Sequence, residues 1–280
     1  MADPISVTRN GHCTFLKWHR ARRRASDPVF TGKRIVEGMR LGASVEVDLV
    51  VTADKGLAVL HDATLDRETT GLGPVAATSD AAIRQLNLRD NDGQPIADKV
   101  MLLDDLCAIL ASGTIHPEAL LQLDYKEDET VLDSRSVANF ARATAPVAKS
   151  MIVSSGSAKA VKMLTDAVPG MRSGFDPSDE SRFTSALASG ELQRFVDDAV
   201  AAAPDADLIY LYWEIVTLAA DAGFDIIAAF HKGSKRIDAW TIRSVDEASL
   251  AVVERLLSLK VDQITTDDPE GLAAALGVPA

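Results

Sequence analysis

Residues 44–50 read SVEVDLV, a run in which apolar and charged residues alternate. Because successive residues of a strand point to opposite faces, Glu46 and Asp48 share one face while the valines and Leu49 share the other. Burying two unpaired carboxylates costs several kcal/mol. The strand therefore needs cations beside it, supplied either by arginine and lysine side chains in a structural salt bridge or by a metal ion.

Seven other short apolar runs bounded by turn residues also predict strands. They cover residues 14–19, 119–125, 151–154, 171–175, 207–212, 237–242 and 262–265. Stretches with helical spacing lie between them; Ile35, Val36 and Met39 share one helix face, as do Leu250, Val253, Leu256 and Leu257. Eight alternations of strand and helix in about 250 residues favour the α/β class, and a closed (β/α)₈ TIM barrel over an open doubly wound sheet.

The barrel is predicted to form one domain over residues 10–278. No GxGxxG or Walker loop supports a nucleotide-binding alternative. Residues 63–99 are polar and too long for an ordinary connection, so we expect an elaborated, functional loop after the second strand. Ser244 and Glu247 match a capping box and predict that a helix starts directly after the seventh strand.

Charge and composition exclude several classes of protein. The 280 residues carry a formal charge of −12, which argues against a general binder of nucleic acid or anionic membranes. No apolar run approaches the roughly 20 residues that cross a bilayer, so no membrane insertion is expected. Cys13 and Cys107 cannot form a disulfide framework, and no basic and apolar leader opens the sequence. We expect a cytoplasmic protein; the sequence leaves its oligomeric state open.

A basic run interrupts this acidic chain at the end of the first strand. Lys17, Arg20 and the three arginines 22–24 surround His19. Such a run is typical of a solvated loop, but beside a histidine it also suits a small anionic substrate.

A second histidine and a third acidic position follow. His61 and Asp62 come thirteen residues after Asp48, beyond a turn that brings the chain back to the same rim. A structural histidine bonded to Asp62 is the alternative. The third strand ends with Asp124 and Lys126, an acid and a cation two residues apart on one face.

The three inward acids suggest one divalent cation. Glu46, Asp48 and Asp124 supply the oxygen ligands that Mg²⁺ or Ca²⁺ prefer, with Mn²⁺ as a further possibility. Zinc would recruit histidine or cysteine more often. Arg20 and Lys126 are then free to neutralise a phosphate.

Taken together, these segments resemble the glycerophosphodiester phosphodiesterase (GDPD) family of the PLC-like phosphodiesterase superfamily. The family strings HRG, PENT, E-x-D, HD, LDRTT-G-G, E-x-K, WT and TDxP are matched, in order, at residues 19–21, 28–31, 46–48, 61–62, 65–73, 124–126, 240–241 and 266–269. The resemblance runs from His19 to Pro269. It implies a barrel phosphodiesterase in which His19 and His61 act as acid and base, and Glu46, Asp48 and Asp124 hold the metal.

The sequence departs from the family pattern at positions that bear on the substrate. Val29 and Phe30 replace the glutamate and asparagine of PENT, and Asp124 replaces a glutamate, as in the related sphingomyelinase D group. We therefore expect Arg20 and Lys126 to contact phosphate, and Phe30 and Trp240 to contact the organic part of the substrate.

Three functions remain open from sequence. The first is hydrolysis of a small soluble glycerophosphodiester or sugar phosphodiester, including the agrocinopine type. The second is a sphingomyelinase D-like lyase or phosphotransferase that forms a cyclic phosphate. The third is a catalytically silent barrel that binds a phosphodiester. The presence of both histidines and all three acids argues against it.

Overall fold

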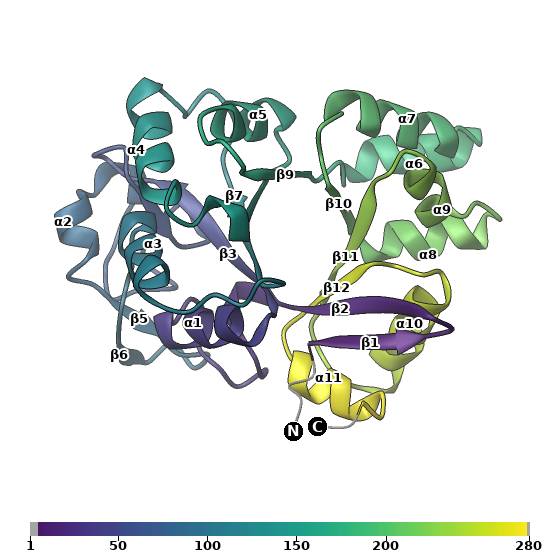
Figure 1. The fold of residues 1–280 in the computed structure, drawn as a ribbon, viewed down its shortest axis with the longest axis horizontal. Helices are drawn as coiled ribbons and strands as arrows, with labels where there is room; N and C mark the ends of the chain where they lie inside the picture. Colours follow the sequence, from purple (N-terminus) through teal and green to yellow (C-terminus); the bar gives the residue numbers. More distant parts are fainter. Residues whose placement is uncertain (1–4, 279–280) are drawn as a thin grey trace.

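Eight parallel strands close into a barrel in the computed structural model, which describes residues 5–278. In order around the barrel they are β2 (His12–Trp18), β3 (Ser44–Val51), β7 (Leu120–Tyr125), β8 (Met151–Ser154), β9 (Arg172–Phe175), β10 (Leu208–Tyr212), β11 (Arg236–Ile242) and β12 (Gln263–Thr266). β12 pairs in parallel with β2, and β2 pairs with β3 to complete the ring (Figure 1). The predicted (β/α)₈ barrel is confirmed, and each predicted strand lies within two residues of an observed one.

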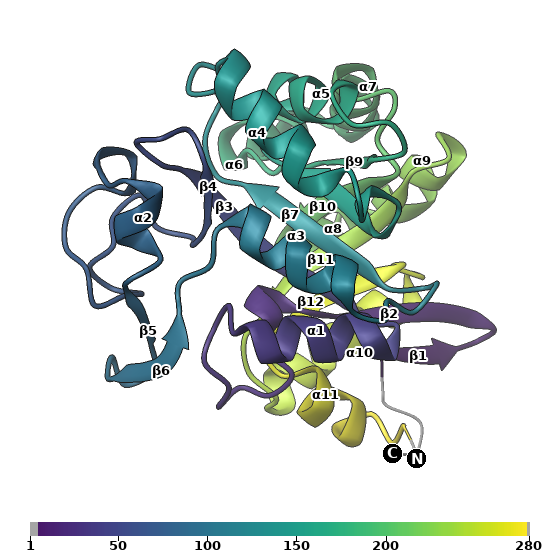
Figure 2. The ribbon, with the colours of Figure 1, turned by 60° about the vertical axis from the view of Figure 1, so that its left-hand side comes forward.

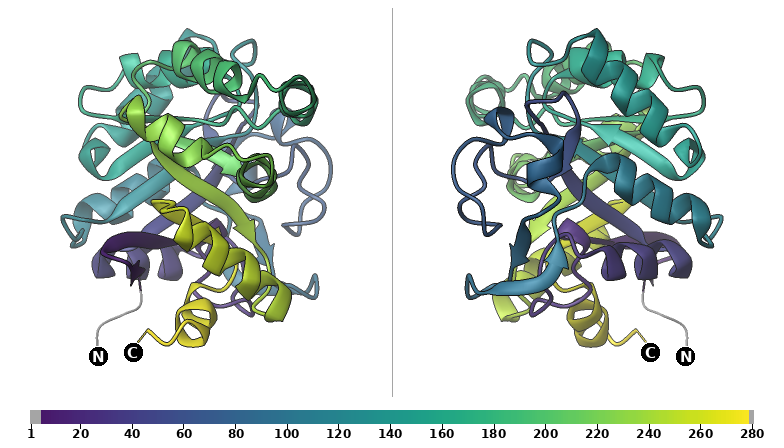
Figure 3. Two further views of the ribbon diagram at one scale, coloured as in Figure 1. Left: turned by 90° about the vertical axis from the view of Figure 1, so that its right-hand side faces the viewer. Right: turned by 90° about the vertical axis from the view of Figure 1, so that its left-hand side faces the viewer.

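Helices follow the strands and surround them on the outside (Figure 3). They are α1 (Gly32–Leu41), α3 (Leu103–Ser112), α4 (Ser134–Thr144), α5 (Ala158–Asp166), α6 (Glu180–Ser189), α7 (Leu192–Ala202), α8 (Trp213–Asp221), α9 (Ile226–Lys232), α10 (Glu247–Ser258) and α11 (Pro269–Ala275). The outward faces of the strands and the inner faces of these helices make up the hydrophobic core.

Strand β3 shows how the alternating sequence determines the two faces. Val45, Val47 and Leu49 are fully buried and belong to the core between strands and helices. Helix α1 packs closely over this face, because a Cβ added at Gly38 would lie only 2.5 Å from Cγ2 of Val45. Glu46 and Asp48, on the other face, point into the barrel.

The long connection after β3 is an elaborated excursion, as expected. The chain first returns antiparallel to β3 as β4 (Leu57–Val59), then runs through α2 (Asp80–Ile83) and the hairpin of β5 (Asn87–Arg89) and β6 (Pro95–Lys99). Figure 2 shows this segment standing out on one side of the barrel. The amide of Asn91 donates to the carbonyl of Ala25 (3.0 Å), which ties the excursion to the basic loop after β2. A further strand, β1 (Ser6–Arg9), pairs antiparallel with β2.

The start of α10 corrects one local prediction. The helix begins at Glu247, directly after the seventh barrel strand, but its N-cap is Asp246, whose carboxylate accepts from the backbone N–H of Ser249 (2.8 Å). The Ser244 hydroxyl donates to Asp246 instead of capping the helix itself (2.7 Å). Aspartate caps as well as serine and stands closer to the helix.

Two further features concern membrane spans and cysteines. Within residues 5–278, no helix has the length and apolar character needed to cross a bilayer. Cys13 is exposed, Cys107 is buried, and both are free thiols.

Candidate active site

A cavity of about 130 Å³ opens at the carboxyl ends of the barrel strands. This is the end at which active sites of (β/α)₈ barrels lie. All but one of the predicted site residues line it: His19, Arg20, Glu46, Asp48, His61, Asp124, Lys126 and Trp240. The barrel therefore brings together side chains that lie up to 221 positions apart, from His19 to Trp240.

Three carboxylates form the centre of the site. One oxygen each from Glu46, Asp48 and Asp124 lies within 4.8 Å of the others. β3 and β7 are paired in register, with Asp48 beside Asp124, which explains the proximity. Burial and the neighbouring Asp48 raise the pKa of Glu46 well above its usual value. Burial also opposes ionisation of Asp48, but Lys126 and Arg20 outweigh it and lower the pKa of this carboxyl.

These residues fit a divalent cation. Oδ2 of Asp48 is buried and has no hydrogen-bond partner. Three carboxylates this close repel one another unless a cation lies among them. Their oxygens are the donor type of Mg²⁺ and Ca²⁺ sites.

Two cationic side chains border the acids. Nζ of Lys126 lies 2.9 Å from Oδ2 of Asp124 and 3.3 Å from Oδ1 of Asp48. Nε of Arg20 lies 3.3 Å from Oδ2 of Asp48, and its backbone N–H donates to Oε2 of Glu46 (2.6 Å). Arg20 and Ala21 both adopt left-handed backbone conformations (φ 51° and 59°), so the tight turn after β2 aims Arg20 into the cavity.

His19 is held by an acid from the other end of the chain. Its Nδ1 lies 2.5 Å from Oδ1 of Asp267, which follows β12, and Arg22 donates to the same oxygen. Burial lowers the pKa of His19, although the bond to Asp267 opposes this shift. Burial therefore favours the neutral form of the His19 ring. Donation from Nδ1 to Asp267 leaves Nε2 as the nitrogen that can accept a proton.

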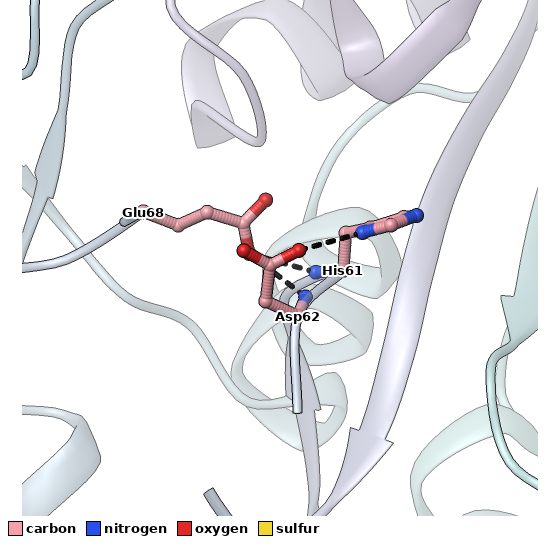
Figure 4. A group of neighbouring side chains, drawn as sticks. All are labelled: His61, Asp62 and Glu68. Atoms are coloured by element: carbon pink, nitrogen blue, oxygen red, sulfur yellow. Dashed lines mark hydrogen bonds and ion pairs between the residues drawn. The ribbon is translucent and has the colours of Figure 1, made fainter. Parts of the chain in front are cut away.

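His61 has a similar arrangement. Its Nδ1 lies 2.8 Å from Oδ1 of Asp62 (Figure 4). Arg67 contacts both oxygens of Asp62 at 2.6 Å. Hydrogen bonds from Arg67, followed by the bond to His61, lower the pKa of Asp62 to about 2. The ring is one-third exposed, with Nε2 again left for proton transfer.

Glu68 fixes the backbone beneath His61. Its buried carboxylate accepts from the backbone N–H groups of His61 (2.9 Å) and Asp62 (3.1 Å) (Figure 4). Arg67 also donates to it (3.1 Å). His61, Asp62 and Glu68 are close enough to be considered as a metal site. Their hydrogen bonds to one another and to Arg67 satisfy them without a metal ion.

The other wall of the cavity carries neutral donors. The hydroxyl of Tyr210 and Nε1 of Trp240 are buried and have no hydrogen-bond partner. Asp176 lines the same wall, and burial raises its pKa to about 6. The ring of Trp240 also contacts that of Tyr212, with centroids 5.0 Å apart.

Phe30 is the predicted site residue that the structure places elsewhere. Its side chain is 1% exposed, packs in the hydrophobic core and does not line the cavity. A buried ring cannot present a face to a sugar, so the prediction for Phe30 is wrong. The remaining arginines of the basic run also bind acids of the chain: Arg22 binds Asp267, Arg23 binds Glu37 and Glu270, and Arg24 binds Glu270.

Several side chains at the site were not assigned by the sequence reasoning. Asp267 stood in a recognised string after the last strand, and its place at the same rim was the signal that could have paired it with His19. Glu68 also stood in a recognised string, at residues 65–73, but nothing in the sequence shows that this loop folds back under His61. Asp176 and Tyr210 stood in no recognised string.

Comparison with known proteins agrees with this geometry. The family model described as "Glycerophosphoryl diester phosphodiesterase family" matches residues 37–271. A search among proteins of curated function returns no significant match.

Solved structures share the fold. A glycerophosphodiester phosphodiesterase from Agrobacterium tumefaciens is 22% identical, with 93% of this chain and 99% of that chain covered and a TM-score of 0.65. One from Thermotoga maritima is 16% identical, with 92% and 96% covered and a TM-score of 0.62. A phosphodiesterase from Oleispira antarctica, solved with the product sn-glycerol-3-phosphate, is 16% identical, with 94% and 96% covered and a TM-score of 0.65.

At these identities the solved structures show the barrel alone, whereas the family model matches the sequence itself over most of its length. The chain therefore belongs to the glycerophosphoryl diester phosphodiesterase family and is a phosphodiester hydrolase.

Proposed function

We propose that this chain is a metal-dependent phosphodiesterase that hydrolyses a small hydroxylated phosphodiester by acid–base catalysis with His19 and His61. The observation that carries the proposal is the placement of two aspartate-bound histidines around one cluster of three carboxylates. A glycerophosphodiester or a sugar phosphodiester fits the chemistry of the cavity.

Glu46, Asp48 and Asp124 would hold the cation. When bound, a Mg²⁺ or Ca²⁺ ion there polarises a phosphoryl oxygen and offsets the charge that develops during displacement. Mn²⁺ is a third candidate. Oδ2 of Asp48 accepts no hydrogen bond, and this together with the mutual proximity of the acids supports the assignment.

Arg20 and Lys126 bind and orient the phosphate. Both line the cavity beside the three acids and carry positive charge. The guanidinium and ammonium groups donate to phosphate oxygens and fix the ester for in-line attack.

His19 acts as the general base and His61 as the general acid. The pKa of His19 is lowered mainly by burial, so the neutral ring with a lone pair on Nε2 is the resting form. It takes the proton of the attacking water, and Asp267 stabilises the imidazolium that forms. His61, whose ring is more exposed, acts in its imidazolium form: Nδ1–H stays bound to Asp62, and Nε2–H gives its proton to the leaving alkoxide.

Tyr210 and Trp240 bind the organic part of the substrate. Their unpartnered donors face the cavity and Asp176 offers an acceptor, a combination that suits hydroxyl groups. The Oleispira antarctica phosphodiesterase was solved with sn-glycerol-3-phosphate, which is a hydroxylated product of this kind. Phe30 gives no support to a specific sugar such as that of an agrocinopine.

A panel of phosphodiesters assayed with Mg²⁺, Ca²⁺, Mn²⁺ or EDTA tests the proposal, with products identified by ³¹P NMR. We expect a phosphomonoester from glycerophosphodiesters or sugar phosphodiesters, formed only with a divalent cation. A cyclic phosphate would instead establish the lyase or phosphotransferase alternative, and binding without turnover would establish a silent barrel. The cytoplasmic location, the single domain over residues 10–278 and the absence of nucleic-acid binding stay predictions.

A further inference from the structure

Lys17 is a buried cation that the proposed mechanism does not use. It lies on β2, two residues before His19, and lines the same cavity. Its side chain is 2% exposed, and Nζ lies 2.9 Å from Oδ2 of Asp238, which is itself fully buried. A buried ion pair inside a barrel is costly unless its hydrogen bonds are complete.

Three groups surround the Lys17 ammonium. They are the carboxylate of Asp238, Oε1 of Gln122, and the face of the Tyr210 ring, whose centroid lies 4.5 Å from Nζ. Asp238 also accepts from Thr265 (2.6 Å). Lys17 therefore does not act as a substrate contact, although it lies at the cavity floor.

The hydrogen bonds continue from Gln122 to the acid cluster. Nε2 of Gln122 donates to Oγ of Ser154 (2.8 Å), and this hydroxyl donates to Oδ1 of Asp124 (2.6 Å). An unbroken chain thus runs from Lys17 through Gln122 and Ser154 to Asp124. It crosses from β2 to β7 and β8 inside the barrel.

The ammonium determines the direction of every bond in this chain. Because Lys17 can only donate, Gln122 must turn its oxygen toward Lys17 and its NH₂ toward Ser154. Ser154 then accepts from Gln122, and its own proton is left for Asp124. Lys126 donates to the other oxygen of Asp124 (2.9 Å), so both oxygens of this carboxylate are fixed as acceptors.

We propose that Lys17 is a positioning residue that acts through Gln122 and Ser154 to orient Asp124 as a ligand for a divalent cation. The inference rests on the proposed function, because it assumes that the three acids bind a metal. Groups that hold a metal ligand in place typically contribute 10- to 100-fold to metal affinity.

Metal affinity measured by isothermal titration calorimetry with MnCl₂ tests the chain link by link. We expect Ser154→Ala and Gln122→Leu each to raise the dissociation constant about 10- to 100-fold. Because both break one chain, the double variant should bind no more weakly than Ser154→Ala alone. Independent, multiplicative losses would overturn the proposal.

Lys17 itself is tested without leaving Asp238 unpaired. The variant Lys17→Met with Asp238→Asn removes both charges together, and it should weaken Mn²⁺ binding by the same factor as Gln122→Leu. Wild-type Mn²⁺ affinity in this variant would overturn the role of Lys17; if the variant does not fold, Lys17→Gln with Asp238→Asn takes its place.

Melting temperatures measured in EDTA show whether the variants act on the metal ligand or only on the stability of the barrel. Ser136→Ala, which removes a buried serine hydroxyl from the N-terminal turn of α4, is the matched control and should leave the Mn²⁺ affinity unchanged. If Ser154→Ala and Gln122→Leu lower the melting temperature but keep the wild-type affinity, the chain only stabilises the barrel and the inference is wrong. A wild-type protein that binds no divalent cation would overturn the metal assignment as well.

Discussion

Each histidine at the site is fixed by an aspartate, and each aspartate by an arginine. Asp267 and Arg22 hold His19, while Asp62 and Arg67 hold His61. Nδ1 is occupied in both rings, so both present Nε2 to the cavity. The two differ in their surroundings, because His19 is more deeply buried than His61. Burial favours the neutral form of the His19 ring, whose Nε2 can accept a proton.

Removing either imidazole should stop proton transfer without releasing the metal. We expect His19→Ala and His61→Ala to lower kcat about 10²- to 10⁴-fold while the Mn²⁺ dissociation constant stays near that of the wild type. Steady-state kinetics and calorimetry measure the two quantities. His231→Ala, which removes a histidine bound to Asp262 outside the cavity, is the control. A variant that loses its metal but keeps its turnover at saturating metal would show that the histidine is a ligand.

The pH profile should report the environment of His19. Burial lowers its pKa below 6.5, so kcat/KM should hold as the pH falls to 6.5 and decline only at a lower pH. Asp267 raises this pKa, so Asp267→Asn should move the acid limb to still lower pH. The same shift affects the free energy of unfolding. Below pH 6.5 the histidine binds a proton more readily in the unfolded chain than in the folded one, so the stability falls as the pH drops through 6.5. An acid limb that moves upward in Asp267→Asn would contradict this assignment.

The loop that follows β4 is organised around one buried carboxylate. The carboxylate of Glu68 accepts hydrogen bonds from the backbone N–H groups of His61 and Asp62, and so holds the two ends of the segment 61–68 together. Arg67 also donates to this carboxylate. This segment carries the proposed general acid, His61, so we expect its rigidity to affect both stability and rate.

Glu68→Ala should therefore destabilise the protein and slow it. Two N–H groups lose their acceptor, at about 1–3 kcal/mol for each group left unsatisfied. We expect a lower urea midpoint together with a reduced kcat. Glu68→Gln keeps an acceptor oxygen and should recover part of both. If Glu68→Ala and Glu68→Gln lose kcat equally and keep the wild-type stability, the charge of Glu68 matters and its hydrogen bonds to the backbone do not.

The barrel elements were predictable because their signals are local. Alternation in residues 44–50 and the apolar runs of the other strands depend only on neighbouring residues, and they identified all eight strands. The acids on β3 and β7 followed from the same alternation. Phe30 was misplaced because the sequence does not show which way a loop side chain turns. Glu68 and the bonds from Lys17 to Asp124 depend on contacts between distant segments, which no local pattern encodes.

Charge is distributed unevenly over the whole molecule. The chain carries a formal charge of −12, and the three arginines 22–24 of the basic run are bound to acids of the chain. Three carboxylates nevertheless meet at the barrel centre with Arg20 and Lys126 beside them. A cation bound among them relieves repulsion in the folded state only.

Divalent cations should therefore raise the melting temperature. At a concentration 100 times the dissociation constant, binding to the folded state contributes about 2.7 kcal/mol, which corresponds to a shift of several degrees. Differential scanning fluorimetry with EDTA and then Mg²⁺, Ca²⁺ or Mn²⁺ measures it. The variant Asp48→Asn should lose most of the shift. A melting temperature that no divalent cation changes would argue against the metal site.

Hydrolysis in H₂¹⁸O tests the central proposal most directly, because it asks whether water is the nucleophile at this site. A glycerophosphodiester is incubated with the enzyme and a divalent cation, and the product is followed by ³¹P NMR. We predict an acyclic phosphomonoester that carries one ¹⁸O from the first turnover, visible as an isotope shift of its phosphorus signal. A cyclic phosphate formed first and without ¹⁸O would contradict direct attack by water.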